Sequence, residues 1–155
     1  MTAIDAPLYF DDLVVGQTLV SGTHALNEAQ IIAFGSEFDP QPFHTNPEAA
    51  KSTFFKGLAA SGWHTAGISM RLMVEGGLPF AGGLIGAGCT LEWPEPTRPG
   101  DILQVECEIV ELIPSKSRPD RGLVIVRCVT LNQERKVRQI MTGKMIVPRR
   151  AERSA

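Results

Sequence analysis

An acid and a histidine five positions apart, Asp39 and His44, lie in the run Asp-Pro-Gln-Pro-Phe-His. A carboxylate beside an imidazole is the simplest side-chain pair that moves a proton to or from water near neutral pH. Pro40 and Pro42 fix their own φ angles and disfavour helix in the residues before them. We therefore predict a stiff, non-helical loop that holds both groups at a solvated pocket.

The chain on either side of this loop is predicted to be helical. Asn27 begins the first helix, with Gln30 in the capping-box position, and the helix must stop by Phe38. After the loop, an Asn-Pro pair begins a second helix over residues 47–56, which ends at Gly57. The predicted loop is thus held at both ends by helix termini.

A long apolar segment runs from Trp63 to Val74 and ends at a Gly-Gly pair. Between Trp63 and Glu75, the only formal charges are those of Arg71 and Glu75 when His64 is neutral. A helix that is apolar nearly all round belongs in a core. We expect it to be the central helix around which a curved sheet wraps.

The second half of the chain has the pattern of a β-sheet. One short strand is expected earlier, at 19–25, and four more strands, separated by turn signals, at 84–93, 102–113, 122–132 and 137–147. Early helices and late antiparallel strands predict an α+β fold. We expect one domain over residues 1–155, with an extended lead-in at 1–17, a core over about 8–148 and a solvated tail at 149–155.

Composition excludes several classes of function. A net charge of −2 without a long basic run gives no support for nucleic-acid binding. No apolar run approaches the ~20 residues that span a bilayer, and the N-terminus lacks a basic signal-peptide region. Cys89, Cys107 and Cys128 lack metal-ligand spacing, so we expect free buried thiols in a reducing cytoplasm and no metal site.

The stretch from Phe34 to Gly62 resembles the hydratase motif of the MaoC-like dehydratases, the R-specific enoyl-CoA hydratase group of hot-dog folds. The family pattern contains Gly-Asp-x-Asn-Pro-Leu-His. Here Phe38 replaces the glycine and Gln41 replaces the asparagine, while the spacing of the acid and the histidine is kept. The lead Phe-Asp-Asp-Leu-Val-Val-Gly and the later phrase Arg-Pro-Gly-Asp are also similar to family phrases.

This resemblance covers residues 8–148 and implies a hot-dog fold, an antiparallel sheet wrapped around a central helix. Family members of this size pair as homodimers with the two sheets joined edge to edge. The implied reaction is reversible addition of water to a trans-2-enoyl-CoA, which gives the (R)-3-hydroxyacyl-CoA. It needs no metal or redox cofactor, because the thioester itself acidifies the α-carbon, and coenzyme A is part of the substrate.

The resemblance also implies roles for individual residues. Asp39 and His44 hold and activate the water, and the Gly62 N–H, at the start of the central helix, polarises the thioester carbonyl. The alternative role for this glycine is to permit close packing of the helix on the sheet. His64 is expected to be neutral and hydrogen-bonded, or to lie in the substrate tunnel. The expected substrate-binding residues are Gln41, Phe43, Ser61 and Trp63, with Met70 and Met73 as further candidates for shaping the pocket.

Two other functions remain compatible with the same fold. A hot-dog thioesterase would use the carboxylate to direct water at the carbonyl and would release free thiol from a saturated acyl-CoA. A non-catalytic acyl-CoA-binding partner subunit would keep the pocket without the reaction. The intact pair of Asp39 and His44 argues against the second alternative, whereas Phe38 and Gln41 argue mildly for it.

Overall fold

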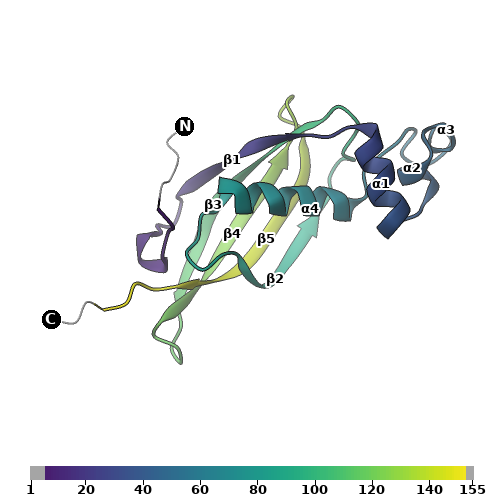
Figure 1. Ribbon diagram of the computed structural model, residues 1–155. Coiled ribbons are helices and arrows are strands. Elements are labelled where there is room, and N and C mark those ends of the chain that lie inside the picture. The colour runs from purple at the N-terminus through teal and green to yellow at the C-terminus, as the bar shows by residue number, and fades with distance from the viewer. Residues whose placement is uncertain (1–5, 153–155) are drawn as a thin grey trace.

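A computed structural model describes residues 6–152, and its centre is a five-stranded antiparallel sheet in the order β1-β3-β4-β5-β2 (Figure 1). The ends of the expected lead-in and tail, residues 1–5 and 153–155, lie outside the described part. The strands are β1 (Thr18–Ala25), β2 (Ile85–Glu92), β3 (Ile102–Pro114), β4 (Arg121–Leu131) and β5 (Val137–Pro148). Each lies within one residue of its predicted bounds, so the α+β hot-dog prediction is confirmed.

Alternating side chains of β3 and β4 form the floor of the core. Leu103, Val105 and Ile109 of β3 are fully buried, and Val124 and Val126 of β4 are buried beside them. The strands pair in register, with Ile109 opposite Val126. Because side chains alternate between the two faces of a strand, one face packs and the other faces solvent. The two edge strands are β1 and β2.

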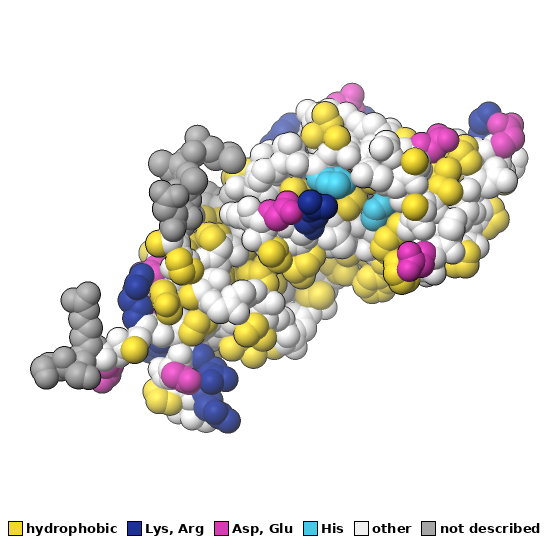
Figure 2. All heavy atoms as spheres, in the orientation of Figure 1, with side chains coloured by type: hydrophobic (Ala, Val, Ile, Leu, Met, Phe, Trp, Pro, Cys, Tyr) yellow, Lys and Arg dark blue, Asp and Glu magenta, His cyan; other side chains and the backbone are white. Residues whose placement is uncertain are grey.

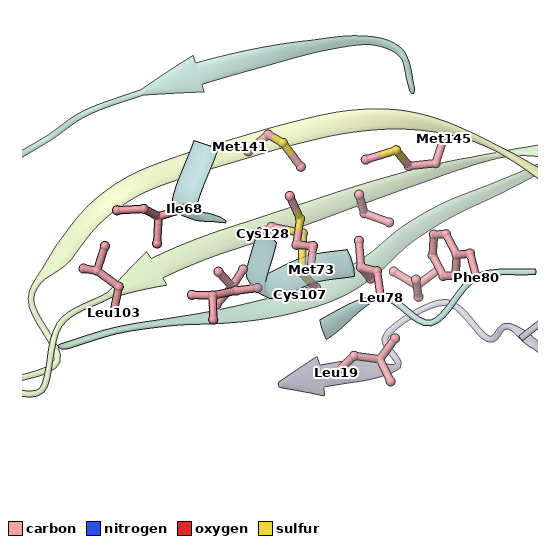
Figure 3. Close-up of a cluster of buried hydrophobic side chains, with 14 of the residues drawn as sticks. Leu19, Ile68, Met73, Leu78, Phe80, Leu103, Cys107, Cys128, Met141 and Met145 are labelled. Atoms are coloured by element: carbon pink, nitrogen blue, oxygen red, sulfur yellow. A yellow bond between two sulfur atoms is a disulfide. The ribbon is translucent and has the colours of Figure 1, made fainter. Parts of the chain in front are cut away.

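Helix α4 (Gly62–Leu72) lies across the packed face of the sheet and continues into a π-helical turn, η2 (Met73–Gly77) (Figure 1). Ile68 and Met73 point into the cluster that also holds Leu103 and Met141 (Figure 3). The opposite side of the helix is not covered within the described chain, since Met70 and other apolar side chains are exposed. The expected central helix is therefore confirmed, but its burial all round is wrong for a single chain.

The helices before α4 form a small layer at one end of the sheet (Figure 1). Helix α1 (Glu28–Phe38) begins and ends as predicted, and the capping box of Asn27 and Gln30 is complete. Two single-turn helices follow, α2 (Pro42–Thr45) and α3 (Pro47–Ala50).

Two predictions for this layer are wrong. The segment after Asp39 is not purely a loop, because Pro42 occupies the first turn of α2, where its missing N–H has no cost. The helix predicted over 47–56 ends at Ala50, and turns follow it. The guanidinium of Arg98 donates hydrogen bonds to the carbonyls of Phe55, Gly57 and Leu58 in this stretch. These tertiary contacts hold a backbone path that is not helical.

The cysteines also differ from the prediction. Cys107 and Cys128 lie directly opposite each other on β3 and β4, both on the packed face, and are joined in a disulfide. Cys89 is a free thiol, but it is exposed on β2 rather than buried. The expectation of three free buried thiols is therefore wrong.

The start of the tail is exposed, and ion pairs hold it to the N-terminal segment. Arg149 pairs with Asp11 at 2.7 Å and Arg150 pairs with Asp12 at 2.8 Å. The guanidinium of Arg150 also lies 4.6 Å from the centre of the Tyr9 ring. Both acids belong to the region of the short 3-10 helix η1 (Phe10–Asp12), so ion pairs join the two ends of the described chain.

Candidate active site

The side chains of Asp39 and His44 meet, as their spacing suggested. His44 Nε2 lies 3.2 Å from Asp39 Oδ2, and His44 Nδ1 lies 2.6 Å from the carbonyl oxygen of Ala59. A carbonyl oxygen only accepts hydrogen bonds, so Nδ1 carries a hydrogen and Nε2 is the nitrogen left to exchange a proton. The acid and the histidine therefore share a proton site between Nε2 and Oδ2.

His44 is held by two close contacts rather than by a solvated loop. Its side chain is buried, with 5% of the residue exposed, which corrects the expectation of a solvent-facing imidazole. Helix α1 approaches so closely that a Cβ on Gly35 would lie 2.7 Å from the His44 carbonyl oxygen and 2.9 Å from the His44 Cβ. The absence of a side chain at Gly35 is thus what allows α1 to pack on α2.

Asp39 is the C-cap of α1 and keeps its carboxylate ionised. Burial raises the pKa of this carboxyl, but the hydrogen bond from Gln41, the Ser61 hydroxyl and the charge of His44 together lower it below its ordinary value. Gln41 Nε2 donates to Asp39 Oδ1 at 2.6 Å. Gln41 therefore holds one carboxylate oxygen and leaves the other directed at His44, a different role from the substrate contact predicted for it.

Ser61 and His64, one turn apart at the start of α4, carry buried polar atoms without partners. Neither Ser61 Oγ nor His64 Nδ1 has a hydrogen-bond partner among the described residues. The Ser61 hydroxyl lies near enough to Asp39 to lower its pKa, yet its geometry is not that of a hydrogen bond. Ser61 was expected to bind substrate, and its hydroxyl is buried beside Asp39.

The ring of His64 packs against helix α1. Burial lowers its pKa, and the charge of His24 lowers it further. Its ring stacks on Phe34 with 4.5 Å between the ring centres. His64 was expected to be hydrogen-bonded, but no partner for its Nδ1 is found among the described residues.

Gly62 is the first residue of α4, with Ser61 as its N-cap. The Ser61 carbonyl accepts from the N–H groups of His64 and Thr65, whereas no acceptor within residues 6–152 is found for the N–H of Gly62. The first N–H groups of a helix are unpaired donors at the positive end of its dipole. A Cβ at this position would meet the Trp93 ring at 2.7 Å, so packing also requires glycine here.

A cavity of about 410 Å³ lies between His44 and the N-terminus of α4. Of the predicted site residues, His44 and Gly62 line it, while Asp39 contacts His44 at 3.2 Å and is not among the lining residues. Phe43 packs edge-on against His44, with ring centres 4.6 Å apart, and Trp63 packs edge-on against Trp93 at 5.5 Å. Neither Phe43 nor Trp63 lines the cavity, and the same holds for Gln41, Ser61, Met70 and Met73.

Several walls of the cavity were missed by the sequence analysis. Phe54 and Phe55 come from the turns that replaced the predicted helix, and Phe54 is 91% exposed. Trp93 follows β2, and its indole N–H donates to Gln139 Oε1 at 2.9 Å. Arg138, from β5, lies at the same cavity. A buried arginine in a strand of apolar residues was the available signal for the last of these.

Other classes of site were sought in the described residues. No helix within 6–152 is long and apolar enough to cross a membrane. The same residues contain no group of three or more His, Cys, Asp or Glu side chains arranged to hold a metal ion.

Comparison with known proteins gives a consistent result. The family model of the MaoC like domain matches residues 12–133. The (R)-specific enoyl-CoA hydratase of Rhodospirillum rubrum is 32% identical over 119 residues, which cover 75% of this chain and 80% of the relative. The 3-hydroxybutyryl-CoA dehydratase of Methylorubrum extorquens is 33% identical over 113 residues, 72% of this chain and 69% of that protein.

A solved structure extends the likeness over nearly the whole chain. The MaoC-like dehydratase from Rhodospirillum rubrum is 55% identical, superposes with a TM-score of 0.92, and the alignment covers 93% of this chain and 99% of that one. The chain described here belongs to the MaoC-like dehydratase family.

Proposed function

We propose that this protein is an acyl-CoA hydratase that adds water reversibly to a trans-2-enoyl-CoA and forms the (R)-3-hydroxyacyl-CoA. The observation that carries the proposal is the pair of half-buried Asp39 and buried His44, 3.2 Å apart, with His44 and the start of α4 lining the same cavity. The hydratase and dehydratase names of the relatives support it.

In the proposed reaction the acid and the histidine act on one water molecule. The ionised Asp39 and the Nε2 of His44 accept a proton from the water as its oxygen bonds to C3 of the enoyl group. The electrons of the C2–C3 double bond move toward the thioester, and the pair returns a proton to C2. One O–H bond is broken, one C–O bond and one C–H bond are formed, and the thioester stays intact.

The Gly62 N–H is proposed to stabilise the negative charge that develops on the thioester oxygen. An unpaired donor at a helix N-terminus is suited to that task, and one such donor is typically worth about 10²–10³ in rate. Because the thioester itself acidifies C2, the proposed reaction uses no metal or redox group.

We also propose that the protein is a homodimer. Strand β2 is an edge strand, and its residues are nearly all exposed in the single chain. Beside it, Trp63, Met70 and Val74 of the α4 region are exposed on one side, and Figure 2 shows hydrophobic side chains gathered on this face. A second copy that pairs β2 with β2 would cover both features. Sedimentation of Val74→Glu would test this, since a monomer is then expected.

The activity is tested by following the loss of the enoyl-thioester absorbance with crotonyl-CoA. Wild-type protein should consume it and give the (R)-3-hydroxy product, and Asp39→Asn should reduce turnover by at least about 10²-fold. Glu48→Gln is the matched control, since this carboxylate is exposed and pairs only with Lys51. Release of free thiol from butyryl-CoA, without hydration of crotonyl-CoA, would instead identify a thioesterase.

A further inference from the structure

A buried cation lies at the same cavity as the catalytic histidine. Arg138, near the start of β5, is only 7% exposed, and it lines the cavity together with His44, Gly62 and Glu95. The walls between these groups are aromatic and apolar, with Phe55 and Trp93 among them. A guanidinium buried at a largely apolar pocket is costly and must be compensated by negative charge.

Two carboxylates provide that charge, and they are held very differently. Asp101 is buried and accepts from Arg138 Nε at 2.9 Å and Nη2 at 3.3 Å. It also accepts hydrogen bonds from Asn132 Nδ2 and the Arg98 N–H, each at 2.9 Å. With four hydrogen bonds, Asp101 is a permanent partner of the arginine.

Glu95 is a replaceable partner. It accepts one hydrogen bond, from Arg138 Nη1 at 2.9 Å, and its side chain is 54% exposed. Arg138 and Asp101 alone sum to zero charge, and Glu95 makes the cluster −1. A half-exposed carboxylate can turn to water at little cost, because its charge remains solvated there. The guanidinium donor that it leaves belongs to a residue that lines the cavity.

We propose that Arg138 is a subsite for a carboxylate at the distal end of the acyl chain, and that this carboxylate replaces Glu95. The inference rests on the proposed hydratase function, since it names the substrate class of that same cavity. The planar guanidinium matches carboxylate geometry, and hydrogen bonds between two charged groups are roughly twice as strong as neutral ones. The exchange leaves the charge of the cluster unchanged.

A purely structural ion pair makes a different prediction. If Glu95 and Arg138 only tie the segment after β2 to β5, then neutralising Glu95 changes stability but not substrate preference. If Glu95 competes with the substrate carboxylate, then Glu95→Gln removes the competitor and improves only substrates that carry the extra charge.

The experiment uses two substrates with the same number of acyl carbons. Pent-2-enoyl-CoA ends in a methyl group, and glutaconyl-CoA ends in a carboxylate. Wild type should prefer glutaconyl-CoA in kcat/KM by about tenfold or more, the scale of one charge-assisted hydrogen bond. Glu95→Gln should increase that preference several-fold further. Glu134→Gln is the matched control, because this exposed carboxylate pairs with Lys136 and is not at the cavity.

Binding of saturated analogues separates this inference from the proposed function. If neither substrate is hydrated, the hydratase proposal fails, and titration with glutaryl-CoA and pentanoyl-CoA still decides the subsite through their Kd values. Equal kcat/KM values for glutaconyl-CoA and pent-2-enoyl-CoA would overturn the subsite. If neither substrate is hydrated, equal Kd values for glutaryl-CoA and pentanoyl-CoA would do so. The exchange with Glu95 predicts that Glu95→Gln changes the preference for glutaconyl-CoA more than Glu134→Gln does. If the two variants change this preference equally, the exchange is overturned.

Discussion

The Trp93 indole occupies the space where a side chain on Gly62 would have to lie, with 2.7 Å between a Cβ at 62 and the ring. The ring cannot move freely, because its N–H is bonded to Gln139 and its edge packs on Trp63. Packing therefore requires a glycine at the N-terminus of α4 whether or not its N–H takes part in catalysis.

This contact determines how the oxyanion role must be tested. Gly62→Ala alone should lower the melting temperature, because overpacking typically costs about 1–3 kcal/mol. Trp93→Ala removes the clashing ring, so the melting temperature of Gly62→Ala/Trp93→Ala should equal that of Trp93→Ala. If the methyl group also tilts the N–H away from the thioester, turnover of the double variant stays at least tenfold below that of Trp93→Ala. Equal turnover of these two variants would show that Gly62 is a packing residue only.

The acid and the histidine should behave as one catalytic unit. Asp39→Asn removes the charge, and His44→Asn removes Nε2 while its amide can still donate to the Ala59 carbonyl. We expect each variant to lose most of its turnover and the double variant to be little worse than either, because groups that act on the same water are not additive. Crotonyl-CoA kinetics on all three variants measure this. Additive losses would contradict a shared water.

Replacing His44 by alanine is a poorer test, for a reason that only the structure provides. The His44 side chain is buried and its Nδ1 donates to the Ala59 carbonyl. A buried acceptor without its partner typically costs about 1–3 kcal/mol. His44→Ala therefore mixes a loss of stability with a loss of chemistry.

Gly35 should act on catalysis through the position of His44. Gly35→Ala forces the backbone of α2 away, because the Cβ would meet the His44 carbonyl and Cβ rather than a flexible tip. We expect a lower melting temperature and, in the protein that remains folded, a kcat reduced at least tenfold with a smaller change in KM. If Gly35→Ala has a normal kcat when assayed below its melting temperature, Gly35 serves packing only.

The matched control is Gly22→Ala, on strand β1, away from the proposed dimer face. A Cβ at this position has no heavy atom within 4 Å, and the residue is exposed. Since alanine is better than glycine in a strand interior by roughly 0.5–1 kcal/mol, this variant should be as stable as wild type or more so. Its turnover should be unchanged.

Local sequence signals were sufficient where neighbouring residues decide the structure. The capping box of Asn27 and Gln30 and the turn signals between the late strands predicted elements that the structure confirms. The helix predicted over 47–56 ends early, and the turns at its expected end are bonded through the carbonyls of Phe55, Gly57 and Leu58 to Arg98, which lies 40 or more residues away in sequence. Local helix propensity does not depend on such a distant contact and so cannot predict it.

The same distinction holds at the candidate site. Asp39 and His44 were found because the spacing that unites them is local. Ala59, Trp93 and Arg138 reach the site from three other parts of the fold, and only the packing of the helices on the sheet brings them there. Long-range partners of this kind decide burial, tautomer and cavity shape, which is why the sequence predicted the reacting groups better than their environment.

Asp101 should make stability depend on pH at the acid end. Burial raises the pKa of this carboxyl, but the hydrogen bonds from Arg138, the Arg98 N–H and Asn132 outweigh it and hold the pKa below its ordinary value of 3.8. A carboxyl with a lowered pKa in the folded state binds fewer protons than in the unfolded state. Its contribution is therefore fully present above the unfolded value and is lost as pH falls through the folded one.

Urea unfolding of wild type and Asp101→Asn from pH 7 to pH 2.5 measures this contribution. Loss of one partner from a buried pair typically costs about 3–5 kcal/mol, so the variant should be clearly less stable at pH 7. The difference between the two proteins should stay constant down to about pH 5 and shrink below about pH 4. Asp120→Asn is the control, since that carboxylate is exposed and pairs only with Arg121, and its effect should be small at every pH. A difference between wild type and Asp101→Asn that persists unchanged to pH 2.5 would mean that the Asp101 charge does not stabilise the fold.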